Sequence, residues 1–197
     1  MDAIRLTTCQ GQAIAPHLDA LAELRIRVFR DFPYLYDGDL AYEADYLRRY
    51  AECPASLFVL AFDGDALVGA ATGMPLAEDL AEFRAPFEAQ GIPVEEVFYY
   101  GESVLLPDYR GHGIGKAFMA EREAHAQREG FKTVAFCAVE RPEDHPHRPR
   151  DYVPLHGFWR SRGYARHPEL ATTFHWKDLG EAEESDKPMV FWLKSLG

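Results

Sequence analysis

The sequence predicts a mixed α/β protein whose 197 residues form one domain. Strand-like and helix-like segments alternate along the chain, in the approximate order β-αα-ββ-α-β-α-β-α-ββ. One strand near residue 100 runs into a glycine-rich turn that opens a helix at once. No internal repeat or low-complexity tract divides the chain, and its length suits a single domain.

The composition is typical of a soluble globular protein. Hydrophobic residues make up 47% of the chain, and no apolar run approaches the roughly 20 residues of a membrane span. The net charge of −11 disfavours nucleic-acid binding, which needs a basic surface. That charge also attracts cationic small molecules, although solubility is the simpler explanation. Three scattered cysteines and no basic-then-apolar leader predict a cytoplasmic protein without disulfides or membrane contact.

The first part of the chain predicts one strand, two helices and a hairpin. Residues 4–8 have a strand-like composition. Apolar residues recur every three or four positions in residues 17–29, and residues 40–51 form a second short helical pattern. The apolar runs 56–62 and 66–74 are joined by an Asp-Gly-Asp turn, which is typical of a β-hairpin.

The middle of the chain adds an acidic helix and a strand–turn–helix unit. We expect an extra helix over residues 77–90 and one strand over residues 96–107, ended by its proline. Residues 113–129 predict a helix, since Gly130 follows as a cap. Residues 132–140 have the composition of a buried strand.

The last part of the chain begins with a change of composition. Residues 141–154 contain four prolines and predict a loop or an extended segment. Residues 155–164 predict a short helix that ends at Gly163, and residues 171–179 and 188–196 predict two closing strands.

The glycine-rich turn predicts a binding site for a phosphate group. Glycine occupies every second position of RGHGIG, residues 110–115, directly before a helix. Such a turn exposes backbone N–H groups at the positive end of the helix dipole, and Arg110 and Lys116 add charge. A tight strand–helix turn without a ligand is the alternative.

Two familiar phosphate loops do not match this turn. The Walker pattern would need glycine at Arg110 and a hydroxyl residue at Ala117. The dinucleotide pattern GxGxxG would need a third glycine at Lys116.

The turn instead resembles the [RQ]-x-x-G-x-[GA] motif of the GNAT superfamily, the GCN5-related N-acetyltransferases. The similarity extends upstream through SVLLPDYRGHGIGKAFM and downstream to FWRSRGY, and the order of elements agrees over nearly the whole chain. The resemblance implies a mostly antiparallel twisted sheet of about seven strands with helices on both faces. It also implies that the fourth and fifth strands of that fold splay apart.

The resemblance implies acetyl-CoA as the acyl donor, with no metal. The turn would hold its pyrophosphate, and the preceding strand would pair with its pantetheine arm. The residues implied for the phosphates are Arg110, Gly111, His112, Gly113, Ile114, Gly115 and Lys116. Those implied for the arm are Val104, Leu105 and Leu106.

Glu102 is the first candidate for the general base of a direct transfer to an amine. A carboxylate in an otherwise apolar strand needs a reason, because its burial is costly. Strand alternation would place Tyr100, Glu102, Val104 and Leu106 on one face. A structural carboxylate is the alternative, and Tyr99 or Tyr100 could relay the proton through water instead.

The general acid does not stand at its usual place in the family. Trp159 occupies the position of the family's frequent tyrosine acid, and it would contact the cofactor without protonating a thiolate. Tyr152 occupies the position of a frequent asparagine and is the candidate acid. Cys137 lies in an apolar strand and is interpreted as a core residue, because direct transfer needs no nucleophile.

The acceptor is expected to be a primary amine on a small molecule. The loop 141–154 is either a wall of its site or a rigid solvent loop, and helix 77–90 is a second candidate wall. His145 and His147, even with His156, are weak evidence for a metal, since no third ligand is assured.

Other functions remain open from the sequence. A GNAT-like module could bind acyl-CoA as a sensor without turnover, and a protein N-terminus, a lysine or a longer acyl donor could take part in the reaction. An unrelated phosphate-binding protein ranks low. The closing strands of this fold often form homodimer contacts.

Overall fold

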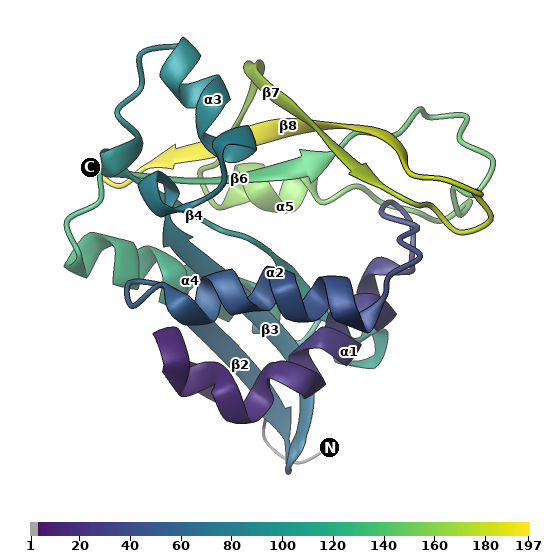
Figure 1. Cartoon of the computed structure of the whole chain (residues 1–197), viewed down its shortest axis with the longest axis horizontal. Helices are drawn as coiled ribbons and strands as arrows, with labels where there is room; N and C mark the ends of the chain where they lie inside the picture. Colours follow the sequence, from purple (N-terminus) through teal and green to yellow (C-terminus); the bar gives the residue numbers. More distant parts are fainter. Residues whose placement is uncertain (1–3) are drawn as a thin grey trace.

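A computed structural model describes residues 4–197 and contains eight strands among them (Figure 1). The strands are β1 (Arg5–Cys9), β2 (Leu57–Asp63), β3 (Ala66–Pro75), β4 (Val97–Tyr99), β5 (Ser103–Leu105), β6 (Thr133–Val139), β7 (Ala165–Trp176) and β8 (Ser185–Ser195). The α-helices are α1 (Leu18–Phe29), α2 (Leu40–Glu52), α3 (Ala81–Ala89), α4 (Ile114–Arg128) and α5 (His156–Ser161). The predicted mixed α/β class is confirmed.

The strands form one mostly antiparallel sheet in the order β1-β2-β3-β4-β6-β8-β7, with β5 also paired to β3. The β4–β6 pair is parallel, and the other pairs are antiparallel. Because β4 and β5 lie along the same edge of β3, they act as one divided strand, and the expected number of about seven strands is confirmed.

Helices cover both faces of the sheet. On one face, α4 and α5 pack over an apolar cluster that includes Phe98, Phe118 and Trp192. On the other face, α1 and α2 cover one cluster around Leu24 and α3 covers a second cluster. Figure 1 shows α1 and α2 in front of β2 and β3, with α3 nearer β4 and β8.

Several local signals are confirmed at the residues that produced them. The turn between β2 and β3 contains Gly64 at a φ of 58°, a conformation that glycine adopts without strain. The structure adds a cap that was not predicted, because the Asp39 carboxylate accepts hydrogen bonds from two N–H groups of the first turn of α2. Gly130 and Gly163 adopt positive φ just after α4 and α5. No helix among residues 4–197 is both long and apolar enough to cross a membrane.

The single strand expected over residues 96–107 is wrong, because a bulge divides it into β4 and β5. Met74 of β3 pairs with Tyr99, and Ala71 pairs with Ser103. Two residues of β3 therefore face residues 100–102 on the other strand, and the extra residue breaks the alternation.

The bulge also overturns the expected grouping of Tyr100 with Glu102. The Tyr100 ring faces α4, where the guanidinium carbon of Arg122 lies 4.0 Å from its centre. Glu102 faces the opposite side, towards α1 and α2, and shares that face with Val104.

Two other boundaries differ from the prediction. The helix expected over residues 77–90 begins only at Ala81, because the backbone at Asp79 is extended after a short 3-10 turn. The closing strands are longer than predicted, and β7 starts at Ala165. Pro168 interrupts the sequence pattern, but a register shift between His167 and Ala171 absorbs it.

Candidate active site

Strands β5 and β6 diverge and leave one edge of β5 open, which confirms the predicted splay. The parallel pairing of β4 with β6 extends to Tyr99 and Ala135, and the N–H of Tyr100 donates to the Ala135 carbonyl at 2.8 Å. Beyond that point β6 pairs with β8, whereas β5 pairs only with β3 among the described strands.

The backbone of β5 offers hydrogen-bonding groups at this open edge. The carbonyl of Glu102 and the N–H of Leu106 bond to β3, at 3.1 and 3.0 Å respectively. By alternation, the N–H and carbonyl groups of Ser103 and Leu105 point to the open edge. The Leu105 carbonyl accepts a hydrogen bond from the Arg110 side chain at 3.1 Å, so Arg110 lies on that side too.

The glycine turn lies at the end of this edge and opens α4. Gly111 and Gly113 have φ of 82° and 86°, so their backbone requires glycine. Gly113 is the N-cap of α4, and no side chain caps the first turn. Gly115 has no such backbone requirement, and an added Cβ would come no closer than 4.0 Å to Phe158. Its lack of a side chain is unexplained by the chain itself and fits the close approach of a ligand.

Most residues of the predicted phosphate site are exposed around this turn. Arg110, Gly111, His112, Gly113 and Lys116 are exposed, whereas Ile114, the first residue of α4, is buried against the sheet. Of the residues predicted to hold the arm, Val104 is buried in the α1–α2 cluster, and Leu105 and Leu106 are partly buried. The structure therefore brings the two predicted parts of the cofactor site into one continuous line.

Glu102 projects from the bulge into a buried ion-pair network. Its Oε2 lies 2.6 Å from a terminal nitrogen of Arg25 and accepts a hydrogen bond from Tyr46 at 2.9 Å. Arg25 also pairs with Glu43. The Oε1 of Glu102 is buried and accepts no hydrogen bond from the described residues. Glu102 is thus held firmly through one oxygen, while the other is unoccupied.

Arg25 is the positive centre of this network. Burial alone would lower the pKa of Arg25, but attraction to Glu102, Tyr46 and Glu43 raises it above its usual value. The guanidinium also lies 4.0 Å from the centre of the Tyr46 ring. A permanent positive charge therefore stands beside Glu102.

Arg122 of α4 supports the bulge from the opposite face. One of its terminal nitrogens donates to the carbonyls of Thr72 and Glu102 at 3.1 and 3.0 Å. The other donates to the Ser103 hydroxyl at 2.7 Å. The side chain is 1% exposed, and it gives a second donor to two carbonyls that also accept backbone N–H groups, from Gly101 and from Thr72.

Trp159, at the position where the family often has its acid, and the candidate acid Tyr152 pack in two different places. Trp159 packs against Phe136 and Trp192, with ring centres 5.0 Å apart in both cases, on the face of α4 and α5. Tyr152 packs edge-on against Phe32 at 4.7 Å, in the connection between α1 and α2. Burial raises the pKa of the Tyr152 phenol.

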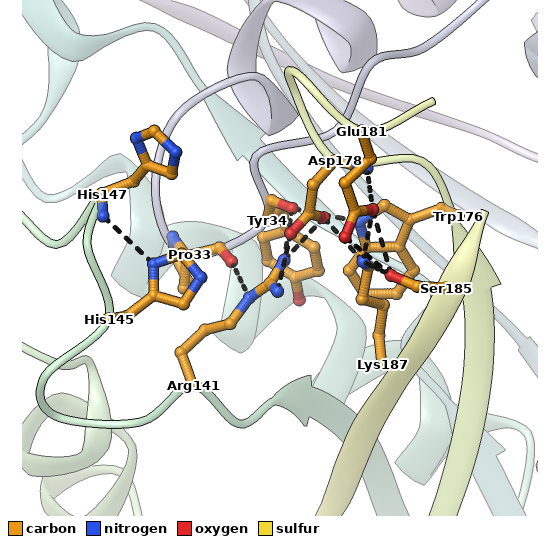
Figure 2. Close-up of polar contacts among 10 residues, drawn as sticks. All are labelled: Pro33, Tyr34, Arg141, His145, His147, Trp176, Asp178, Glu181, Ser185 and Lys187. Carbon is orange, nitrogen blue, oxygen red and sulfur yellow. Dashed lines mark hydrogen bonds and ion pairs between the residues drawn. The ribbon is translucent and has the colours of Figure 1, made fainter. Parts of the chain in front are cut away.

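The start of the loop 141–154 is tied to the connection between α1 and α2, as Figure 2 shows. Arg141 donates to the carbonyls of Pro33 and Tyr34, both at 2.8 Å. It also pairs with Asp178 at 2.8 Å, and Asp178 lies 3.2 Å from the amine of Lys187. This network places Tyr34 between β6 and the loop, where burial raises the pKa of its phenol.

Sequence reasoning missed Arg25, Tyr34, Tyr46 and Arg122. Arg25, Tyr34 and Tyr46 lie far along the chain from the glycine turn, and helical periodicity assigns no special role to a polar residue on a helix such as Arg25, Tyr46 or Arg122. The cluster of aromatic residues at 32–36 was the one available signal for Tyr34. Within residues 4–197, no three His, Cys, Asp or Glu side chains gather as a metal site.

The fold and the open-edged site define a class of acyltransferase, and residues 18–149 match the acetyltransferase (GNAT) family. The protein belongs to this family. No curated protein gives a significant match to the sequence.

Solved structures share the fold at low sequence identity. Ribosomal-protein-alanine N-acetyltransferase from Brucella melitensis is 16% identical with a TM-score of 0.61, covering 96% of this chain and 99% of its own. The yncA protein of Salmonella typhimurium, with its cofactor acetyl-CoA, is 10% identical with a TM-score of 0.61, covering 100% and 95%. An aminoglycoside 6'-N-acetyltransferase complexed with coenzyme A is 16% identical with a TM-score of 0.59, covering 97% of each chain.

Proposed function

We propose that this protein is an N-acetyltransferase that transfers an acetyl group from acetyl-CoA to a primary amine of a small molecule. The observation that carries this proposal is the line formed by Glu102, the open edge of β5 and the uncapped turn at α4. An extended arm with a thioester at one end and phosphates at the other fits this line. The acetyl-CoA and coenzyme A of two solved structures support the same donor.

The open edge would hold and orient the donor. The N–H groups at the first turn of α4 would bind the pyrophosphate, with Arg110 and Lys116 adding positive charge. Ser103 and Leu105 would pair their backbone with the pantetheine arm, as a strand pairs with its neighbour. Ser103 lies one residue from Glu102, so this pairing would fix the thioester beside the bulge.

Glu102 would act as the general base for the acceptor amine. Its free Oε1 accepts a proton from the amine as the nitrogen bonds to the thioester carbon. The carbon–sulfur bond then breaks, and the thiolate takes a proton. Tyr152 remains our candidate donor of that proton, and its raised pKa keeps the phenol protonated at neutral pH. Trp159 would contribute packing alone.

A second candidate function is an acyl-CoA-binding module without turnover. Two observations favour it: Glu102 is already ion-paired with Arg25, and Trp159 packs into the core where the family often has an acid. Such a module would bind acetyl-CoA as tightly as an enzyme and release no thiol.

Calorimetric titration with acetyl-CoA, followed by a thiol-release assay over a panel of amines, tests the proposal. Binding with thiol release on at least one amine is the expected result. Binding without release on small amines, peptides or polyamines would favour the module. Absence of binding would contradict both functions.

A further inference from the structure

The connection between α1 and α2, residues 30–39, carries a phenol whose ring is firmly packed. The carbonyl of Tyr34 accepts hydrogen bonds from Arg141 at 2.8 Å and from the indole N–H of Trp176 at 3.0 Å. Its ring packs on those of Trp176 and Phe29, with ring centres 5.9 and 4.7 Å apart. The contacts drawn at Tyr34 in Figure 2 end on this carbonyl, and none ends on the hydroxyl. The network therefore fixes the residue and leaves its hydroxyl for another purpose.

The backbone beside Tyr34 is held in a conformation that costs energy. Leu35, the next residue, has a φ of 54°, a left-handed conformation that a leucine rarely adopts. Two hydrogen bonds fix it, because its N–H donates to the Asp31 carbonyl at 3.1 Å and its carbonyl accepts from the N–H of Leu179 at 2.7 Å. Strain of this kind costs about 1–3 kcal/mol and is concentrated at functional sites. The fold thus maintains the position of Tyr34 against a local cost.

The Tyr34 hydroxyl lies at the edge of β6 that faces β5. The N–H of Glu140 donates to the Pro188 carbonyl of β8 at 2.9 Å, so by alternation the N–H of Val139 points to the opposite edge of β6. Among the described strands, that edge has no partner beyond Ala135. Although burial raises the pKa of the Tyr34 phenol, a hydrogen bond with the backbone of Val139 lowers it, which is the effect of an N–H donor. The hydroxyl therefore reaches the gap between the two diverging strands.

A phenol in this setting donates a hydrogen bond and keeps its proton. Its oxygen accepts from the Val139 N–H, so its own hydrogen is available to a group in the gap. Burial holds the pKa of the phenol above its usual value, although the positive charge of Arg25 also acts on it in the opposite direction. Arg25 is the partner of Glu102, so the hydroxyl lies at the end of the gap where the bulge stands.

The proposed transfer creates a negative charge that the site must stabilise. As the neutral amine adds to the thioester carbon, one electron pair of the carbon–oxygen double bond moves to the oxygen. A donor already aimed at that oxygen lowers the barrier, because it needs no rearrangement while the charge forms. Of the residues assigned above, Glu102 takes the proton of the amine and Tyr152 serves the sulfur. Neither of them serves the thioester oxygen.

We propose that the Tyr34 hydroxyl is the oxyanion donor of this site, hydrogen-bonded to the thioester oxygen from the β6 side of the gap. The hydrogen bond strengthens as the oxygen gains charge. It weakens again when the electron pair re-forms the double bond and the carbon–sulfur bond breaks. No proton leaves Tyr34, so the hydroxyl is unchanged after each turnover. The assignment rests on the proposed acetyltransferase function and leaves the role of Tyr152 as it stands.

Tyr34→Phe tests the donor, because it removes one oxygen atom and keeps the ring against Trp176 and Phe29. For an amine that the wild-type protein acetylates, kcat should fall by about a hundredfold. The KM for the amine and the affinity for acetyl-CoA should stay the same, since the hydrogen bond matters most once charge has formed. Tyr42→Phe, at a tyrosine that is 56% exposed on α2, is the matched control and should change none of these quantities.

Infrared spectroscopy of bound acetyl-CoA, labelled with carbon-13 at the thioester carbonyl, gives a readout without turnover. A hydrogen bond to the oxygen weakens the double bond and lowers its stretching frequency. The carbonyl band should therefore lie at a lower frequency in the wild type and in Tyr42→Phe than in Tyr34→Phe. A tyrosine that only packed against its neighbours would leave the band in place.

The outcomes distinguish the oxyanion donor from the function on which it rests. An active wild type whose kcat survives Tyr34→Phe would overturn the oxyanion donor alone, with or without a shift of the band. A loss of kcat without a shift of the band would also overturn it and would give Tyr34 a structural role. A wild type that binds acetyl-CoA and acetylates no amine would overturn the proposed function, and the band would still show whether Tyr34 contacts the thioester.

Discussion

At the scale of single residues, Glu102 shows how one side chain can be both fixed and available. Arg25 and Tyr46 hold Oε2, and this pairing offsets much of the cost of burial. Oε1 has no partner among residues 4–197. The carboxylate is therefore fixed in place through Oε2, while Oε1 is free to accept a hydrogen bond.

Replacing Glu102 with Gln should separate binding from transfer. The variant keeps the shape of the side chain, so acetyl-CoA affinity should stay the same. It cannot accept the proton of the amine, so the rate of transfer should change. Transfer should fall by about a hundredfold, and more at lower pH, where the amine is protonated. Steady-state rates and calorimetry on the same preparation measure both quantities. Glu96→Gln, at a surface ion pair with Lys132, is the control, and full activity in Glu102→Gln would remove Glu102 as the base.

At the scale of elements, the divided strand and the turn into α4 create the site together. The β4–β6 pairing ends at the bulge and leaves one edge of β5 open, while Arg122 adds hydrogen bonds to the carbonyls of Thr72 and Glu102. The turn then directs the chain into α4, with two positive-φ glycines at its start. The order of these elements along the chain places the glycine turn, with Arg110 and Lys116 beside it, at the end of the open edge of β5.

The glycine turn should lose its ligand if a side chain is added at Gly113. Valine is strained at a φ of 86° and would narrow the space above the N–H groups. We expect Gly113→Val to weaken acetyl-CoA binding by at least about tenfold in a calorimetric titration. Gly91→Val carries similar backbone strain, at a φ of 68° after α3, and should bind normally. Equal affinity in both variants would contradict the assignment of the turn.

The bulge should depend on Arg122. Arg122→Leu removes the charge-assisted hydrogen bonds to the carbonyls of Thr72 and Glu102 and to the Ser103 hydroxyl, so the free energy of unfolding should fall by about 3 kcal/mol. Urea denaturation monitored by tryptophan fluorescence measures this change. Arg128→Leu, in the exposed last turn of the same helix, should cost well under 1 kcal/mol, or roughly 0.5. Similar losses in the two variants would mean that Arg122 does not support the bulge.

At the scale of the whole molecule, one buried network joins three distant parts of the chain. Arg141, Asp178 and Lys187 link the loop after β6 with the β7–β8 hairpin, and Arg141 also holds the carbonyls of residues 33 and 34 (Figure 2). The connection between α1 and α2 is therefore fixed by residues more than a hundred positions away. The arrangement makes the proposed acceptor side of the site sensitive to the far end of the chain.

Lys187 is the most buried charge of this network, at 2% exposure. Lys187→Met should remove the partner of Asp178 and Glu181 and lower the free energy of unfolding by about 3 kcal/mol. The loss should be accompanied by a higher KM for the acceptor with unchanged affinity for acetyl-CoA. Thermal unfolding measures the loss of stability. Lys132→Met, which removes the exposed ion pair with Glu96, is the control. An unchanged KM would show that the network serves stability alone.

The sequence predicts those features that depend on neighbours along the chain. The hairpin at Gly64, the caps at Gly130 and Gly163 and the turn from Arg110 all follow from local backbone requirements. The site residues of the glycine turn were predictable for the same reason, and their role in binding stays a prediction.

The missed features depend on contacts between distant segments. Residues 96–107 form two strands and not one because of the residues of β3 that lie opposite them. The sequence of residues 96–107 does not indicate this pairing. The length of β7 beyond Pro168 likewise depends on its pairing with β8. Asp79 and Arg25 look like ordinary surface charges until α2 and α3 bury them.

The open edge of β5 also bears on the solubility of the protein. An unpaired strand edge is a template on which another chain can assemble, and long exposed edges promote aggregation. Here the edge is only as long as Ser103–Leu105, bounded by the bulge at Glu102 and by Pro107, which cannot donate a hydrogen bond. A strand of another chain would form few backbone hydrogen bonds there. A slender ligand that continues to the α4 turn would bond to the edge of β5 and to the N–H groups of the turn. The same interruption that shortens the open edge therefore limits its pairing with other polypeptides.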